Sequence, residues 1–133
     1  MMNRSMPPSV VIPELPCSDV REAVAWLCRS FGFVERLRIG DHRAQLLFGD
    51  GSLIVTQRST DSSASSSLLV RVADIDAHFE RVKQSGARIV NSPANYPYGE
   101  WQYTVEDFGG HHWTFSQTIA DIDPSTWGGM LFE

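Results

Sequence analysis

The chain repeats itself, and this repeat restricts the possible folds more than any other feature. Cys17-Ser18-Asp19-Val20 and Val72-Ala73-Asp74-Ile75 are separated by 55 positions. Each follows a short apolar run and precedes apolar residues at three- and four-residue spacing, the pattern of an amphipathic helix. A duplicated unit of this size is compatible with few architectures.

Both halves predict the same order of elements: a strand, a helix and three strands. In each half an aspartate, Asp19 or Asp74, is placed to cap the helix, and a glycine, Gly32 or Gly86, to end it. The hairpin signals Asp50-Gly51 and Gly109-Gly110 precede the last strand of each half. We predict strands over 10–12, 33–39, 44–48 and 53–55 in the first half, and over 68–72, 87–90, 101–105 and 112–116 in the second. The segment 91–99, rich in Pro, Tyr and Gly, is predicted to be a loop.

The chain is therefore expected to be an α+β protein built from two tandem βαβββ modules with the helices on the outside. We predict one domain over residues 1–133. It consists of a first module (9–57), a serine-rich flexible linker (58–67), a second module (68–117) and a tail (118–133). Asp123-Pro124 followed by Gly128-Gly129 predicts one helical turn that presents Trp127, either over the open end of a cleft or to a partner subunit.

Composition and charge exclude several classes of partner. The chain has 133 residues, 11 Lys and Arg against 16 Asp and Glu, and a net charge of −5, so nucleic acid is not an expected partner. No segment approaches the ~20 apolar residues of a membrane span, and no apolar stretch follows Arg4 as a leader requires. The two cysteines, Cys17 and Cys28, have no metal-ligand spacing and indicate thiols in a reducing compartment. We expect a cytoplasmic protein without a membrane partner.

Several motifs identify a resemblance at the family level. They are the Gly32-Phe33-Val34 that follows the first helix, the Lys83-Gln-Ser-Gly-Ala87 at the end of the second, and Asp107-Phe-Gly-Gly-His-His-Trp-Thr-Phe115. With the paired modules, residues 9–117 resemble the vicinal oxygen chelate superfamily. That superfamily includes glyoxalase I, extradiol dioxygenases, fosfomycin-resistance enzymes and bleomycin-resistance proteins. The resemblance implies a curved mixed sheet around a cleft and a homodimer.

The resemblance also implies where a metal would be bound in metal-dependent members: on the first and last strands of each module, by side chains that face inward from the curved sheet. The matching positions here are Ile12, Ser67, Val55 and Thr114, and none of these residue types is a usual ligand of a divalent ion. We therefore predict no metal and no other cofactor. A shift of one or two residues leaves a non-standard set, Glu14, Gln57 and His112, as the alternative.

The aromatic residues carry the case for binding. Tyr96, Tyr98, Trp101 and Tyr103 lie within eight residues, and such side chains offer rigid contact faces with a polar handle. Trp101 and Tyr103 share strand parity, so the alternative is that both fill the core beneath a helix. Trp113 and Phe115 also share strand parity, and we predict that both lie in the core. The predicted ligand-binding residues are Glu14, Gln45, Tyr98, Trp101, Gln102, Tyr103, His112 and Thr114.

Structural roles are the alternative to ligand binding for the polar candidate residues. Glu14 is alternatively held by Arg43 or Arg71, and His112 has a structural alternative at its turn. Adjacent strand residues point to opposite faces, so His111 and His112 cannot chelate one ion together. No nucleophile motif such as Gly-x-Ser-x-Gly is present, and no catalytic residue is predicted.

These observations predict a metal-independent protein that sequesters a small molecule, for example an antibiotic, reversibly in an aromatic-lined cleft. One alternative is a metal-dependent enzyme of the glyoxalase, lyase or dioxygenase type. A second alternative is a non-catalytic interaction module.

Overall fold

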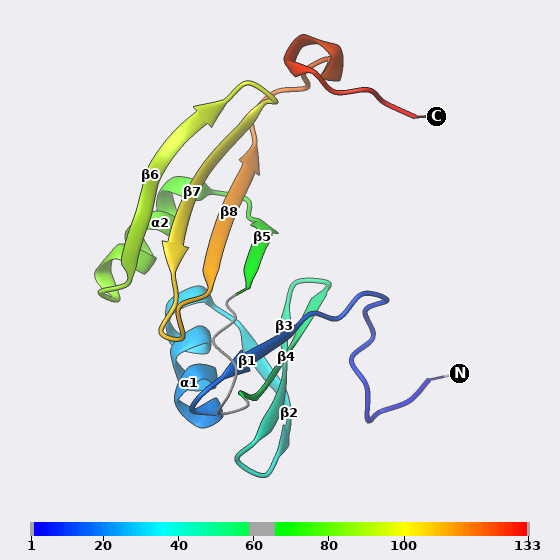
Figure 1. Cartoon of the computed structure of the whole chain (residues 1–133), viewed down its shortest axis with the longest axis vertical. Helices are drawn as coiled ribbons and strands as arrows, with labels where there is room; N and C mark the ends of the chain where they lie inside the picture. Colours follow the sequence, from blue (N-terminus) through cyan, green and yellow to red (C-terminus); the bar gives the residue numbers. More distant parts are fainter. Residues whose placement is uncertain (1, 59–65, 133) are drawn as a thin grey trace. The chain divides into compact units, whose positions relative to one another are not determined.

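The computed structural model describes residues 2–58 and 66–132, which divide into two compact units. Unit 1 comprises Met1–Ser66 with Phe108–Gly110, and unit 2 comprises Ser67–Asp107 with His111–Glu133. Each unit contains a four-stranded mixed sheet and one α-helix in the order predicted from the repeat (Figure 1). The α+β class and the two βαβββ modules are thus confirmed. Residues 59–65 of the predicted linker lie outside the described residues.

Unit 1 orders its strands β1-β4-β3-β2, with β1 parallel to β4 and the other pairs antiparallel. Its helix begins after Asp19, whose carboxylate accepts the Glu22 N–H, and ends at Gly32 as predicted. The helix buries Val24, Leu27 and other apolar side chains against the sheet. The elements are β1 (Glu14–Cys17), α1 (Val20–Phe31), β2 (Val34–Ile39), β3 (Arg43–Phe48) and β4 (Gly51–Gln57).

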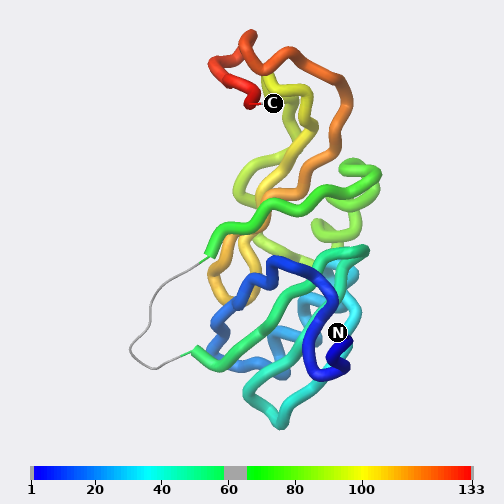
Figure 2. The backbone as a smooth tube through the Cα atoms, turned by 90° about the vertical axis from the view of Figure 1, so that its right-hand side faces the viewer, coloured from blue at the N-terminus to red at the C-terminus, as the bar shows by residue number. Residues whose placement is uncertain are grey.

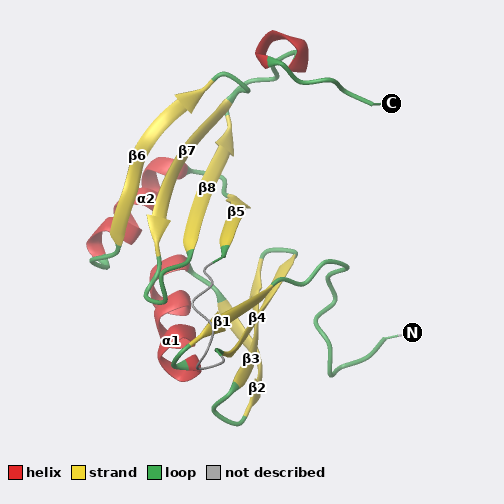
Figure 3. Ribbon diagram, in the orientation of Figure 1, coloured by secondary structure: helices red, strands yellow, loops and turns green. Residues whose placement is uncertain are grey.

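Unit 2 repeats this topology as β5-β8-β7-β6, with β5 parallel to β8. Its helix lies behind the strands in Figure 3. The chain then continues into a tail that contains one short 3₁₀ helix, the helical turn predicted before Gly128. The elements are β5 (Ser67–Arg71), α2 (Ile75–Gln84), β6 (Arg88–Tyr96), β7 (Glu100–Glu106), β8 (His112–Thr118) and η1 (Pro124–Trp127).

The core of unit 2 is aromatic. Trp113 and Phe115, predicted as core by strand parity, are fully buried and stack with ring centroids 6.2 Å apart. The Asp107 carboxylate is 8% exposed and accepts the Trp113 Nε1–H at 2.9 Å and the His111 backbone N–H at 2.9 Å. The motif at the last hairpin therefore ties the turn to the core.

Two predicted strands are wrong in position. Val10, in the predicted strand 10–12, is 99% exposed, and the first strand is instead β1. A strand that begins after Pro13 and contains Pro16 is possible here because β1 is an edge strand, paired only with β4. The predicted loop 91–99 is largely strand, because β6 continues to Tyr96 through two register shifts, the second of which spans Pro93. None of the helices among the described residues is long and apolar enough to cross a membrane.

Candidate functional site

The face of the unit 2 sheet opposite α2 is lined with polar side chains. The side chains of a strand alternate between its two faces. The helix side holds the buried Tyr103, Val105 and Trp113, so the residues adjacent to them in β7 and β8 lie on the other side. We call this surface the polar face. It consists of Ser67, Leu69 and Arg71 on β5, His112, Thr114, Ser116 and Thr118 on β8, and Glu100, Gln102, Thr104 and Glu106 on β7.

A chain of hydrogen bonds runs across the polar face. Tyr98 Oη donates to Gln102 Oε1 at 3.1 Å, and Gln102 Nε2 donates to Ser116 Oγ at 2.9 Å. Ser116 Oγ in turn donates to Glu100 Oε1 at 2.6 Å. Gln102 and Ser116 are 7% and 1% exposed, so the ladder orients buried polar groups rather than surface ones.

Glu100 forms the anionic end of this ladder. Burial pushes the pKa of its carboxyl upward, but hydrogen bonds from Ser116 and Thr118 and the nearby Arg71 guanidinium outweigh burial. The pKa of Glu100 therefore lies below its ordinary value, and the group is ionised at neutral pH.

An aromatic cluster adjoins the ladder. Tyr96 and Tyr98 stack with ring centroids 5.6 Å apart, and Trp127 meets Tyr98 edge-on at 5.5 Å. The tail that carries Trp127 crosses the β6–β7 turn closely, since the Ile119 N–H donates to Gly99 O at 2.9 Å. Trp127 is 44% exposed, so part of its ring remains available for contact.

The opposite end of the polar face holds a second set of polar pairs. Thr104 Oγ1 and Thr114 Oγ1 are 2.8 Å apart. Beyond them, His112 Nε2 lies 3.2 Å from Glu106 Oε1, and Arg88 Nη1 lies 3.5 Å from Glu106 Oε2. His112 thus belongs to a partly buried contact with the Glu106 carboxylate at the end of the strand.

The sheet divides the predicted aromatic residues between its two faces. Tyr98 adjoins the polar face, but Trp101 and Tyr103 point toward α2, the alternative noted for them. Trp101 Nε1 donates to Asp76 Oδ1 at 3.0 Å. Tyr103 is fully buried, its Oη lies 2.6 Å from His78 Nδ1, and burial raises the pKa of its phenol. Of the unit 2 candidates, Tyr98, Gln102, His112 and Thr114 share one side of the sheet.

The two remaining candidates lie in unit 1. Glu14 pairs with Arg43 at 3.2 Å, one of the two arginines predicted for it. Gln45 is 2% exposed, and both ends of its amide are engaged: Oε1 accepts from Arg36 Nη1 at 2.6 Å and Nε2 donates to Ser5 O at 2.8 Å. Gln45 therefore anchors the N-terminal segment to the sheet.

A comparison with models of known protein families identifies the family of this chain. The model described as Glyoxalase/Bleomycin resistance protein/Dioxygenase superfamily matches residues 9–115. The chain belongs to this superfamily. The vicinal oxygen chelate resemblance inferred from the repeat and the Asp107 motif is confirmed.

Solved structures of this superfamily resemble the chain over most of its length. TioX from Micromonospora sp. ML1 is 35% identical with a TM-score of 0.75, covering 84% of this chain and 99% of that chain. TnmS3, an antibiotic binding protein from Streptomyces sp. CB03234, is 26% identical with a TM-score of 0.72, covering 85% and 98%. A curated relative, the uncharacterized protein Mb0911c of Mycobacterium bovis, is 33% identical over 52 residues, which are 39% of this chain. The match spans about a third of that relative's length, 34%.

Superfamily membership raises the question of a divalent metal, and the residues at the expected positions do not fit one. Ile12 precedes β1, and Ser67 and Thr114 carry hydroxyls only. Val55 points toward α1, because it pairs in register with buried Leu15. The predicted inward orientation of Val55 is therefore wrong, as expected when the assumed register of a strand is off by one residue. Across residues 2–58 and 66–132, no three His, Cys, Asp or Glu side chains are grouped to hold a metal ion.

The non-standard set is also separated. In β1 and β4, Glu14 pairs with Ile54 and Cys17 with Gln57, so Glu14 and Gln57 lie on opposite faces of their sheet. Gln57 Nε2 moreover donates to Ser18 O at 2.8 Å. These two side chains cannot ligate the same ion.

The ladder and the aromatic cluster beside it contain three residues that are not among the predicted ligand-binding residues. Ser116 and Glu100 complete the ladder, and Tyr96 forms the stacked pair with Tyr98. The alternation that selected Gln102 and Thr114 also selects Glu100 and Ser116, so this signal was present in the strands. Tyr96 belongs to the aromatic cluster identified in the sequence, but the sequence predicts a loop where the structure has the end of β6.

Proposed function

We propose that the chain binds a small organic molecule reversibly at the polar face of unit 2. The observation that carries this proposal is the ladder from Tyr98 through Gln102 and Ser116 to Glu100, flanked by the Tyr96, Tyr98 and Trp127 rings. Aromatic faces supply contact area, and oriented polar groups supply specificity, the combination typical of small-molecule sites.

The chemistry of the polar face defines the class of ligand. A planar ring would contact Tyr96, Tyr98 and the exposed part of Trp127. The Glu100 carboxylate favours a ligand group that carries hydrogen-bond donors or a positive charge. An aromatic antibiotic with an amino or hydroxyl substituent meets both requirements. TnmS3, an antibiotic binding protein of similar length and fold, supports this class.

Ligand binding would form no covalent bond. Tyr98 Oη and Gln102 Oε1 satisfy each other in the structure, and a ligand donor competes for the Gln102 oxygen while Ser116 holds the other end of the amide. Such an exchange of one hydrogen bond for another costs little and is reversible. The result is sequestration, in which the protein lowers the concentration of unbound ligand.

We propose that this binding needs no metal. The residue types at the expected positions and the separation of Glu14 from Gln57 support it. The metal-dependent enzyme and the interaction module remain the alternatives. Homodimer formation and a cytoplasmic location also remain predictions.

Calorimetric titration of the full chain with metal-free bleomycin and with doxorubicin, a planar cationic antibiotic, tests the proposal. We expect saturable 1:1 binding of at least one. Tyr98→Ala should weaken it tenfold or more, about 1.4 kcal/mol, because a central aromatic contact is lost. Tyr98→Phe should have a smaller effect, since it removes the hydroxyl and retains the ring.

Trp101→Phe is the matched control, because this aromatic residue lies three positions after Tyr98, on the helix side of β7. It should change affinity less than twofold, and equal losses in Tyr98→Ala and Trp101→Phe would refute the assignment to the polar face. Dialysis against chelator should leave affinity unchanged. A stoichiometric divalent ion whose removal abolishes binding would instead favour the metal-dependent alternative.

A further inference from the structure

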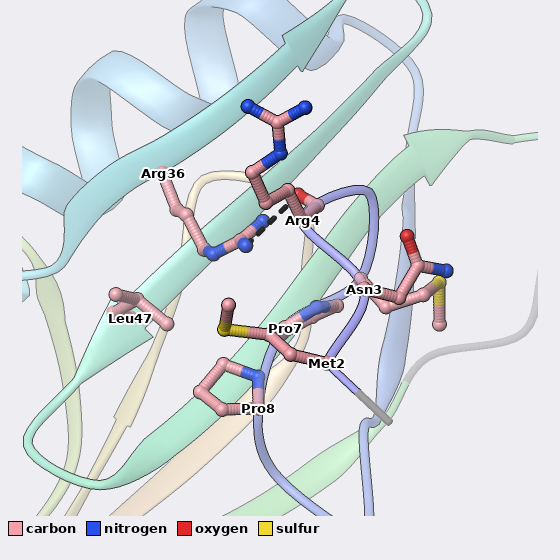
Figure 4. Close-up of a pocket in the computed structure, with 8 residues that line it drawn as sticks. Met2, Asn3, Arg4, Pro7, Pro8, Arg36 and Leu47 are labelled. Atoms are coloured by element: carbon pink, nitrogen blue, oxygen red, sulfur yellow. Dashed lines mark hydrogen bonds between the residues drawn. The ribbon is translucent and has the colours of Figure 1, made fainter.

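A cavity of about 530 Å³ lies in unit 1, between the N-terminal segment and the strands β2 and β3 (Figure 4). Its volume falls within the roughly 300–1,000 Å³ of typical small-molecule sites. The lining is apolar at Met2, Met6, Pro7, Pro8 and Leu47, and polar at Asn3, Arg4 and Arg36.

The N-terminal segment is attached to the sheet at several points. Arg36 Nη2 donates to Arg4 O at 3.0 Å, and Gln45 Nε2 donates to Ser5 O at 2.8 Å. Farther along, Ser9 Oγ lies 2.6 Å from Ser52 Oγ. Pro7 is buried, and the segment runs beside the strands of unit 1 (dark blue in Figure 2). These contacts hold residues 4–9 against the sheet, whereas the Met2 side chain that also lines the cavity is 88% exposed.

A β-bulge directs Arg36 to this cavity. Glu35 pairs with Leu46 and Leu37 pairs with Gln45, so Arg36 is an extra residue in β2. Bulges of this kind re-aim a side chain relative to the regular alternation. Here the bulge places a guanidinium on the face that also carries Gln45 and Leu47.

The charge of Arg36 is not balanced. Its two partners, the Gln45 amide oxygen and the Arg4 carbonyl, are both neutral. Among the described residues no carboxylate pairs with Arg36 or with Arg4, whereas the neighbouring Arg38 is paired with Glu35. A guanidinium has five N–H donors, and two of those of Arg36 are used, so others remain for a ligand.

We infer that this cavity is a second binding site, for an apolar molecule that carries one anionic group such as a carboxylate or sulfonate. The anion would bind Arg36, whose planar fork matches such groups, and the apolar part would contact Met2, the two prolines and Leu47. Its charge preference is opposite to that of the polar face, which presents Glu100.

Two fluorescent probes with nearly the same skeleton test the inference on the full chain: anilinonaphthalene sulfonate, which is anionic, and phenylnaphthylamine, which is neutral. We expect the anionic probe to bind 1:1 and to be displaced by decanoate. Arg36→Met should weaken the anionic probe at least tenfold and the neutral probe less than threefold. Arg36→Lys should retain most of the anionic affinity.

Two further variants locate the probe. Leu47→Trp fills the cavity and should abolish binding of both probes. Arg38→Met, on the same strand but paired with Glu35, should leave both unchanged, as should Tyr98→Ala in the polar face. Undiminished anionic binding in Arg36→Met or Leu47→Trp would overturn the inference. Equal loss of both probes in Arg36→Met would also overturn it, because Arg36 would then only hold the segment in place.

Discussion

Replacing Gly99 with alanine should destabilise unit 2 far more than the same change at Gly86. Both glycines adopt a positive φ, +85° at Gly99 and +82° at Gly86. A Cβ at Gly86 would have nothing within 4 Å, whereas a Cβ at Gly99 would collide with Ala120 O and lie 2.9 Å from Ile122 Cγ1. The pair therefore separates backbone strain from steric collision.

The magnitudes follow from these contacts. Alanine at positive φ costs roughly 1–2 kcal/mol, offset by about 0.4–1 kcal/mol from the stiffer unfolded chain, so Gly86→Ala should cost at most about 1.5 kcal/mol. At Gly99 the tail must also move, which breaks the bond from the Ile119 N–H at about 1 kcal/mol. The Tyr98–Trp127 contact weakens by about 0.5–1.5 kcal/mol more. We expect a total of about 2–4 kcal/mol.

Equilibrium urea unfolding of both variants, followed by fluorescence and far-UV circular dichroism, measures the difference in free energy of unfolding. We expect Gly99→Ala to be less stable than Gly86→Ala by about 1.5–2.5 kcal/mol, the sum of the lost hydrogen bond and the weakened ring contact. A difference below about 0.5 kcal/mol would refute the reasoning, because it would mean that the tail does not rest on the turn.

Two further predictions concern stability. Asp107→Ala should lower the free energy of unfolding by about 2–4 kcal/mol, because it leaves the buried Trp113 indole without its hydrogen-bond acceptor. Asp76→Ala removes the acceptor of an exposed indole and should cost less than about 1 kcal/mol. Chemical denaturation of both variants measures the two losses. Hydrogen bonds, chiefly from Arg38, lower the pKa of Glu35 to about 2 from 4.5. Since the folded-state pKa is the lower one, this stabilisation is present above about pH 4.5 and is lost as pH falls toward 2. Glu35→Gln should therefore be less stable at neutral pH and should show a flatter dependence of the urea midpoint on pH between 5 and about 2, whereas equal slopes would contradict the pairing.

Much of the fold was predictable because its signals are local. Asp19 and Asp74 cap helices in the structure, and Gly32 follows the first helix, where capping chemistry required them. The alternation of apolar and polar residues around Trp113 and Phe115 likewise predicted which side of β8 faces the core, because alternation is also a local signal. These features depend on neighbours within a few residues.

The parts that failed depend on pairing between distant strands. Val55 was assigned to the wrong face because its orientation follows from register with Leu15, and a shift of one residue reverses a strand. Trp101 could be placed beside α2 or on the opposite face until the partner strands were known. The N-terminal segment has no periodicity of its own, so its path over Gln45 was not predictable.

The bulge at Arg36 shows that the surface chemistry of this sheet can be altered independently of its core. Removing that one residue would bring Glu35 and Leu37 into uninterrupted pairing with Leu46 and Gln45, while every other pair of β2 and β3 stayed in place. A single-codon deletion would thus erase a cation from one side of the molecule without repacking the other. In evolutionary terms, a duplicated scaffold of this kind can gain or lose a charge-selective surface by insertion or deletion rather than by redesign of its interior.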